Sequence, residues 1–418
     1  MTTTVAPRWH AAFSPNLALA MTVSGILPTA LGALAVPLDD ALGVSRGRLG
    51  VLAAVYQLMG AVASLWIARG VVRLGGRLGL LMLHAYAAAG LLAAALAPSY
   101  AVLLVAVALL GPVAAAGNPL TNHVIAEHAP RDRWPSIVGV KQSGVQLAIL
   151  VAGLALPALA HAANWRLAML AMLVLPAVGA ALTSGVVPPD RGGRHRASTV
   201  PAAPRAWRLA RTHRFLAWMS GYAAAMGLAL SATLVYLPAF AHDMLGFSVQ
   251  LAGLVAATTG LLGVVGRVAW GRFASGRQAR EAVDLLGVAI GSMIGATCVL
   301  ASGSVATWLV WPGAVGLGGV AALWNVIANT AAIRYLPANH AAAGSAVIQF
   351  GFFAGLVAGP IIFGLLVGSE QRYTAAMLFV VLAFGASTAI ALAWATTTRG
   401  GQADDQRRPP RPVPSQVG

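Results

Sequence analysis

The stretch LGLLMLHAYAAAGLLAAALAPSYAVLLVAVALLGPVAAAGNPLTNHVIA, residues 78–126, contains no Asp, Glu, Lys or Arg. A second charge-free stretch lies at residues 285–333, displaced from the first by 207 positions. Each is long enough for two membrane-crossing helices of about 20 residues. Polar, proline and glycine positions recur with the same displacement: Asn118 and Asn122 as Asn325 and Asn329, Pro130 as Pro337, Gln142 and Gly144 as Gln349 and Gly351. The chain therefore consists of two halves built on one plan.

The composition indicates that this plan is membrane-embedded. Apolar residues make up 58% of the chain, charged residues make up only 9%, and the mean hydropathy is +0.78. A soluble domain carries about 25% charged residues, so this chain does not have enough charge to cover a surface that faces water. Internal repeats around a site at the membrane midplane are typical of secondary transporters.

Charge-free stretches of about 20 residues predict twelve spans, and no segment has the strand alternation of a membrane barrel. We predict an all-α membrane protein with twelve transmembrane helices in two pseudo-symmetric six-helix bundles. The predicted parts are an N-terminal bundle (1–187), a cytoplasmic linker (188–212), a C-terminal bundle (213–398) and a disordered cytoplasmic tail (399–418). The predicted spans are 13–38, 49–68, 78–97, 100–127, 135–160, 165–187, 214–241, 249–273, 282–302, 305–333, 342–368 and 372–397.

The distribution of basic residues gives the predicted orientation. With the N-terminus inside, 21 of the 27 Lys and Arg residues lie in inner segments, 4 lie in outer segments and 2 lie within spans. Because cytoplasmic loops are enriched in Lys and Arg, we expect a multi-pass protein of the bacterial inner membrane with both termini in the cytoplasm. The net charge of +16 then reflects topology and contact with anionic lipid, so we expect no nucleic-acid partner.

Several other classes of function are disfavoured. Cys298, the single cysteine, lies within a predicted span, which excludes an intramolecular disulfide and a cysteine metal site. A membrane enzyme needs clustered His, Asp or Glu side chains at membrane depth, and the spans contain no such cluster. We therefore expect a protein that is not an enzyme and uses no cofactor or metal. We also expect a monomer, because each half can pack its own bundle.

Two loops and one helix resemble the major facilitator superfamily. The sequence ARGVVRLGGR at 68–77 resembles the G-x-x-x-D-R-x-G-R-R signature and retains Arg73, Gly75 and Arg77, with Val72 at the Asp position. After the eighth span, Gly271 and Arg272 begin a G-R-x-A-D-like pattern. The segment 355–360, G-x-x-x-G-P, is similar to the glycine-rich stretch of the eleventh span. The resemblance implies two six-helix halves that alternate access, with these loop residues at a gate.

The cations within the predicted spans point to the kind of cargo. Lys141 and Arg267 are the only two in span interiors, away from the ends, and Lys141 is the only lysine in the chain. A charge in hydrocarbon is costly and usually lines a cavity. An ammonium group also changes its protonation more readily than a guanidinium does when it is buried. The alternative is that Lys141 extends along its helix to the inner interface.

Arg267 has a spacing that the family resemblance makes informative. In monocarboxylate transporters of the superfamily, an Arg four residues before the equivalent of Gly271 contacts the carboxylate of the substrate. Arg267 occupies that position, whereas Gly263 replaces the acid that those proteins carry one turn earlier. The resemblance therefore implies substrate contact by Arg267, and a gating or interfacial role is the alternative.

Repeated amides complete the candidate site. Asn118 and Gln142 lie twelve residues on either side of Pro130, so a helical hairpin places them at equal depth, and Asn325 and Gln349 have the same arrangement around Pro337. They either join the two helices of each hairpin through hydrogen bonds or line the central cavity. We expect substrate binding by Lys141, Arg267, Asn118, Gln142, Asn325 and Gln349.

The sequence thus predicts a secondary transporter for a small organic anion such as a carboxylate. Proton coupling is a hypothesis. No predicted span has an acid in its interior, so a coupled proton would have to be carried by Lys141, a histidine or the substrate. The alternative is a drug/proton antiporter. The pattern Gly144-x8-Gly153-x3-Pro157 is a partial form of the antiporter signature, but Val107 stands where those exporters carry an Arg.

Overall fold

The computed structural model describes residues 10–130, 134–189, 214–274, 281–335, 341–368 and 372–407. Within these ranges the chain forms helices and no strands. Residues 190–212 of the predicted linker and residues 408–418 of the predicted tail lie outside the described part. The last helix continues through residue 399 to Arg407, so a helix lies where the sequence predicts the start of a disordered tail.

The helices of the two halves follow the predicted spans closely. The N-terminal half contains α1 (His10–Ala33), α2 (Ala35–Leu42), α3 (Arg46–Leu74), α4 (Gly76–Ala95), α5 (Tyr100–His128), α6 (Trp134–Ala162), α7 (Trp165–Ala171) and α8 (Val174–Val186). The C-terminal half contains α10 (Arg214–Asp243), α11 (Val249–Ala274), α12 (Glu281–Ser302), η2 (Thr307–Leu309), α13 (Val310–Val315), η3 (Gly316–Val320), η4 (Ala321–Leu323), α14 (Trp324–Tyr335), α15 (Ala341–Val367) and α16 (Tyr373–Arg407).

The helices are long and apolar enough to cross a membrane. Eleven candidate spans are present in the described residues, from Ala11–Ala33 to Tyr373–Thr396. The helix α3, with 29 residues, covers the remaining predicted span. Two spans are interrupted, one between α7 and α8 and one by the π-helical turn η3. The predicted fold class, an all-helical membrane protein, is confirmed.

Local sequence explains where several helices begin. The Ser99 side chain accepts a hydrogen bond from the Val102 amide at the start of α5, and Asn164 does the same for Leu167 at the start of α7. Such side-chain caps satisfy amides that have no partner within the first helical turn. Gly75 separates α3 from α4 with a φ of 80°, a conformation that glycine adopts without steric cost. The signature glycine thus makes the tight turn between these two helices.

The two halves contact one another through closely packed small residues. A Cβ on Gly50 would lie 2.3 Å from the Pro360 carbonyl oxygen, and a Cβ on Gly153 would lie 2.6 Å from the Ala257 amide nitrogen. A displacement of 207 residues converts Gly50 into Ala257 and Gly153 into Pro360. The α3–α15 contact and the α11–α6 contact are therefore repeat-related copies, and small residues allow both to be close.

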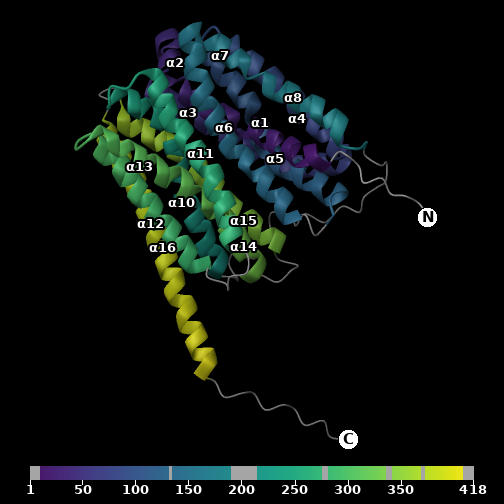
Figure 1. Cartoon of the computed structure of the whole chain (residues 1–418), viewed down its shortest axis with the longest axis vertical. Helices are drawn as coiled ribbons and strands as arrows, with labels where there is room; N and C mark the ends of the chain where they lie inside the picture. The colour runs from purple at the N-terminus through teal and green to yellow at the C-terminus, as the bar shows by residue number, and fades with distance from the viewer. Residues whose placement is uncertain are drawn as a thin grey trace, which may run out of the picture.

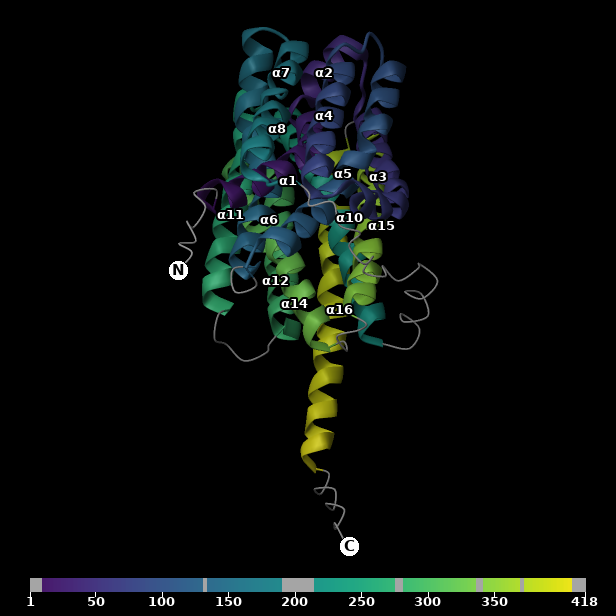
Figure 2. The ribbon, with the colours of Figure 1, turned by 90° about the vertical axis from the view of Figure 1, so that its right-hand side faces the viewer.

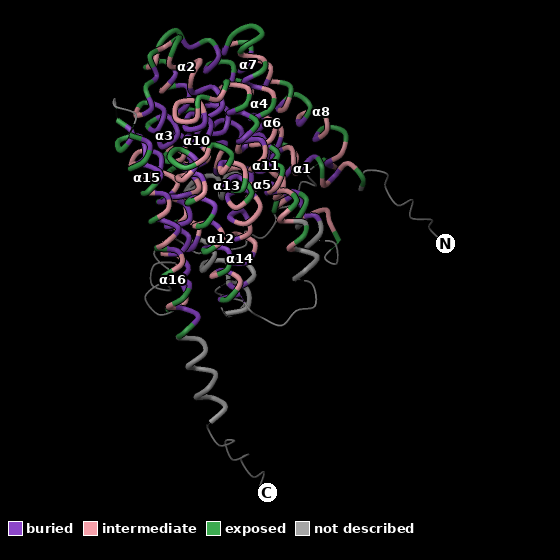
Figure 3. The backbone as a smooth tube through the Cα atoms, turned by 60° about the vertical axis from the view of Figure 1, so that its left-hand side comes forward, coloured by how far each residue is buried: buried purple, intermediate pink, exposed green. Residues whose placement is uncertain are grey.

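The helices of the two halves converge toward one end of the molecule (Figures 1 and 2). We call this the closed end; it contains the α1–α3 connection (residues 34–45) and the α10–α11 connection (residues 244–248). At this end a Cβ on Gly32 would lie 2.6 Å from the Val235 carbonyl oxygen of the other half. Toward the opposite end, where α16 projects, the helix axes diverge (Figure 1). Buried residues concentrate where the halves meet (Figure 3).

Candidate functional site

The helix α5 presents a polar face on the side away from its exposed apolar residues. Val102, Val105 and Leu109 are exposed and mark the side that faces lipid. At 3.6 residues per turn, Asn118 and Asn122 lie on the far side of the helix. Asn122 is nevertheless exposed, so the interior is open to solvent at this level.

The Lys141 side chain of α6 reaches this polar face. Its Nζ atom donates hydrogen bonds to Asn122 Oδ1 at 2.5 Å, Thr121 Oγ1 at 3.0 Å and Asn118 Oδ1 at 3.1 Å. An ammonium group has three donors and no acceptor, so all its hydrogen bonds are made. The residue has a relative exposure of 0%. The interfacial alternative is therefore wrong for this structure, because the side chain points across to α5.

Every partner of this ammonium is electrically neutral. The ion pairs in the described part of the chain join Arg46 to Asp39 and Asp243, and His123 to Glu127. None of them includes Lys141 or Arg267. A buried charge is normally paired, so a lysine surrounded by amide and hydroxyl oxygens leaves an unbalanced positive charge in the N-terminal half.

The amide pair in the same hairpin is also brought together. Gln142 Nε2 donates to Asn118 Oδ1 at 3.3 Å, so this oxygen accepts from both Gln142 and Lys141. Both amide residues are partly exposed. The hairpin therefore contains the interhelical bond that the sequence left as one of two alternatives, and the same side chains border the open interior.

Arg267, on α11, connects the two halves at Gln142, the residue that follows Lys141. Its Nη1 atom donates to the backbone carbonyl of Gln142 on α6 at 2.5 Å, and its Nε atom donates to the carbonyl of Ala322 in η4 at 3.2 Å. These acceptors are neutral as well. The guanidinium therefore adds a second uncompensated cation, and it holds α11 against α6 across the interface of the halves.

The position of the missing acid is filled by a different side chain. A Cβ on Gly263 would lie 2.7 Å from Gln146 Oε1, and Gln146 is buried. An acid at position 263 would therefore overlap with this amide. Neither Gln146 nor Thr121 was predicted from the sequence. The position of Thr121 one residue before Asn122, on a face that was already identified, was the available signal.

The repeat-related hairpin α14–α15 has the corresponding amides but no counterpart of the Lys141 charge. Asn325 and Gln349 are both partly buried. The counterpart of Lys141 is Ile348, which is buried, and the counterpart of Thr121 is Ala328. Beside Asn325, the Trp324 ring lies 4.7 Å from Phe352 between ring centroids. The C-terminal half thus has buried apolar and aromatic side chains where the N-terminal half has an ammonium.

The residues of the predicted gate are only partly described. Arg77 Nη2 donates to the Ser184 carbonyl of α8 at 2.7 Å, which fixes α4 to α8 within one half. The side chains of Arg73 and Arg272 and the surroundings of Gly271 lie outside the described part. In the partial antiporter signature, a Cβ on Gly253 would lie 2.5 Å from Pro157 Cγ, so Pro157 packs at the α6–α11 contact.

Comparison with known proteins identifies the architecture. Residues 17–360 match the sequence model of the Major Facilitator Superfamily. No curated protein matched the chain.

Solved structures share the fold at low sequence identity. A nucleoside transporter, NupG, superposes with a TM-score of 0.70 and 16% identity, covering 93% of this chain and 99% of its own. A bacterial homologue of the human lysosomal transporter Spinster, inward-facing and unoccupied, superposes with a TM-score of 0.70 and 16% identity, covering 94% of this chain and 98% of its own. At such identity the similarity concerns the fold.

Proposed function

This chain belongs to the Major Facilitator Superfamily of membrane transporters, and we propose that it carries a small organic anion, such as a carboxylate, by alternating access. We place it in a bacterial inner membrane with both termini in the cytoplasm, on the basis of the basic residues in its loops. The observation that supports the anionic cargo is the Lys141 ammonium, buried on neutral acceptors with no carboxylate among its partners.

Electrostatics favours an anion at this place. In a medium of low dielectric constant a single charge is costly, and an opposite charge within a few ångströms offsets much of that cost. Arg267 adds positive charge on the neighbouring helix α11, where its present acceptors are backbone carbonyls. A cationic drug would be repelled by both groups, which disfavours the antiporter alternative.

Asn122 is the hydrogen-bond partner of Lys141 that we expect the substrate anion to displace. Its oxygen is the closest acceptor to Nζ, and it is the exposed member of the three partners. We propose that a substrate carboxylate takes the place of this oxygen while Thr121 and Asn118 keep theirs. The exchange replaces a hydrogen bond from the ammonium to a neutral oxygen with one to a charged oxygen, so that both partners carry charge.

Amide and aromatic side chains would contact the rest of the substrate. Gln142 and Asn118 offer both donors and acceptors beside the ammonium, and the C-terminal half offers Asn325, Gln349 and the partly buried Phe352 ring. Since one structural neighbour is a nucleoside transporter, an uncharged cargo that binds to these amides and rings is the second candidate. That cargo would not require Lys141.

Uptake into proteoliposomes distinguishes these candidates. The protein would be tested with radiolabelled small carboxylates and with nucleosides, together with Lys141→Gln and, as a matched loss of positive charge, Arg48→Gln. Arg48 is at the closed end, where it donates to the Gly43 carbonyl. We expect carboxylate uptake that is lost in Lys141→Gln and kept in Arg48→Gln. Nucleoside uptake by both variants, without carboxylate uptake, would contradict the proposal.

A further inference from the structure

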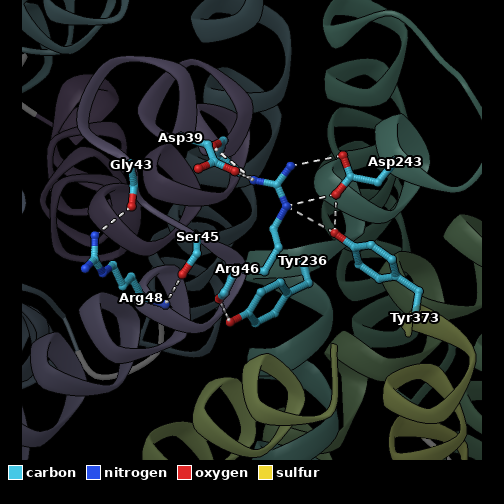
Figure 4. A network of polar contacts seen from close by, with 9 residues as sticks. Asp39, Gly43, Ser45, Arg46, Arg48, Tyr236, Asp243 and Tyr373 are labelled. Atoms are coloured by element: carbon cyan, nitrogen blue, oxygen red, sulfur yellow. Dashed lines mark hydrogen bonds and ion pairs between the residues drawn. The ribbon is translucent and has the colours of Figure 1, made fainter. Parts of the chain in front are cut away.

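A group of charged and phenolic side chains joins the two halves at the closed end (Figure 4). Arg46 is the first residue of α3 in the N-terminal half, and Asp243 is the last residue of α10 in the C-terminal half. Arg46 Nε lies 2.9 Å from Asp243 Oδ2, and Nη2 lies 3.0 Å from Oδ1. This two-point geometry is the strong form of an arginine–carboxylate contact.

The pair is shielded from solvent. The Arg46 side chain has a relative exposure of 6%, and that of Asp243 has 5%. The remaining guanidinium nitrogen, Nη1, donates to the Ala35 carbonyl at 3.2 Å and contacts Asp39 at 3.5 Å. Arg46 therefore has acceptors for all three nitrogens, and most of its charge is balanced by one acid from the opposite half.

Two tyrosines complete the network. The Tyr373 hydroxyl, at the start of α16, donates to Asp243 and accepts from Arg46 Nε at 3.2 Å. The Tyr236 hydroxyl donates to the backbone carbonyl of Arg46 at 2.5 Å, and its ring stacks on Phe363 with 4.5 Å between centroids. Residues of α10, α15 and α16 thus surround the first residue of α3.

This network has no counterpart elsewhere in the repeat. A displacement of 207 residues places Gly253 at the Arg46 position, and Val36 is the counterpart of Asp243. The Arg46–Asp243 contact is also the one ion pair between the halves in the described part of the chain. The shared plan of the halves does not require it, so it serves the closed end in particular.

We propose that Arg46 and Asp243 form a latch that holds this end closed, with Tyr373 as its positioning residue. In alternating access this end must open, and opening separates α3 from α10. If one partner is removed, the closed state keeps an unpaired buried charge, whereas the open state exposes the remaining charge to water. The equilibrium therefore shifts toward opening. The proposal depends on alternating access and not on the identity of the cargo.

The distance between the halves at the closed end provides the test. In a Cys298→Ala background, which removes the single cysteine, spin labels would be attached at Leu96→Cys and Val305→Cys. Both positions are highly exposed, at 62% and 76%, and they lie at this end in opposite halves. Pulsed electron paramagnetic resonance would then measure the distribution of distances between the two spin labels.

We expect a predominantly short distance in the parent protein. Arg46→Gln and Asp243→Asn should each raise the ratio of long to short distances by about tenfold, because a buried charge loses its partner. The double exchange Arg46→Asp with Asp243→Arg should return the ratio toward that of the parent. Tyr373→Phe should give a smaller shift in the same direction, and Arg48→Gln, which removes a nearby exposed charge, should give none.

Unchanged distance distributions in the neutralised variants would overturn the latch. So would a shift that is equally large in Arg48→Gln, since this would show a general effect of charge at this end. If the neutralised variants do not fold, Tyr373→Phe and the charge exchange decide. If the latch exists, Tyr373→Phe raises the ratio of long to short distances. The charge exchange then gives a folded protein with short distances.

Discussion

The hairpins α5–α6 and α14–α15 are copies of one plan, and one buried position carries a charge in the first hairpin and none in the second. Both keep an Asn and a Gln at equal depth, as Asn118 with Gln142 and Asn325 with Gln349. The first has Lys141 where the second has buried Ile348. Since an apolar residue serves at this position in one hairpin, packing alone does not require the lysine in the other. Burying this ammonium costs free energy. We infer that Lys141 is present for substrate binding rather than for folding.

Lys141→Ile makes the first hairpin resemble its copy and should have the largest effect. Loss of a charge-assisted hydrogen bond of about 1.5–3 kcal/mol weakens carboxylate binding by about 10- to 100-fold. We expect the protein to remain folded, as measured by its thermal unfolding in detergent. Carboxylate uptake within a factor of about two of the parent would show that the two hairpins are equivalent in function.

Gly263→Asp tests whether the α11–α6 contact accepts the acid found in the monocarboxylate transporters that the sequence resembles. The new side chain would collide with Gln146, whose Oε1 lies 2.7 Å from the added Cβ. We expect a loss of stability of about 1–3 kcal/mol from overpacking, measured as a lower midpoint of unfolding. Combination with Gln146→Ala should recover part of it. Full stability of the single variant would mean that the amide moves freely.

Asn122→Asp places a permanent carboxylate beside Lys141 and so removes the difference in charge between the hairpins. The new acid would occupy the position that we assign to the substrate. We expect carboxylate binding to fall by about tenfold, or about 1.4 kcal/mol, as measured by equilibrium binding. Asn122→Ala is the control, because it opens this position without adding charge. Equal losses in both variants would contradict the exchange of the Asn122 oxygen for substrate.

Gln142→Ala should have the smallest effect. It removes one hydrogen bond to Asn118, and such bonds between membrane helices contribute about 0.6 kcal/mol on average. Because Lys141 still binds Asn118, we expect a decrease in unfolding midpoint that is barely measurable. A large loss of stability would show that the amide, rather than the lysine, holds this hairpin together.

The sequence predicted the features that depend on periodicity. Charge-free stretches located the helices, because lipid tolerates few charges. The equal spacing of Asn118 and Gln142 from Pro130 predicted their proximity, since a hairpin brings such positions together. Family spacing predicted that Arg267 contacts the substrate; its guanidinium contacts the backbone of α6, and the substrate contact stays a prediction.

Contacts between elements that the repeat does not relate could not be predicted from the sequence in this way. Arg46 and Asp243 are 197 positions apart, and the repeat places other residue types at their counterparts, so no pattern paired them. Gln146 fills a space that only the packing of α6 on α11 creates. The continuation of α16 to Arg407 also differs from prediction, because a polar composition alone did not reveal the helix.

The most direct test of a positively charged interior is equilibrium binding of matched ligands to the purified protein. A small carboxylate and its uncharged primary amide have nearly the same shape and differ in charge. We predict that the parent protein binds the carboxylate at least about tenfold more tightly than the amide, and that Lys141→Ile removes this preference. Equal affinity for both ligands in the parent protein would contradict this prediction.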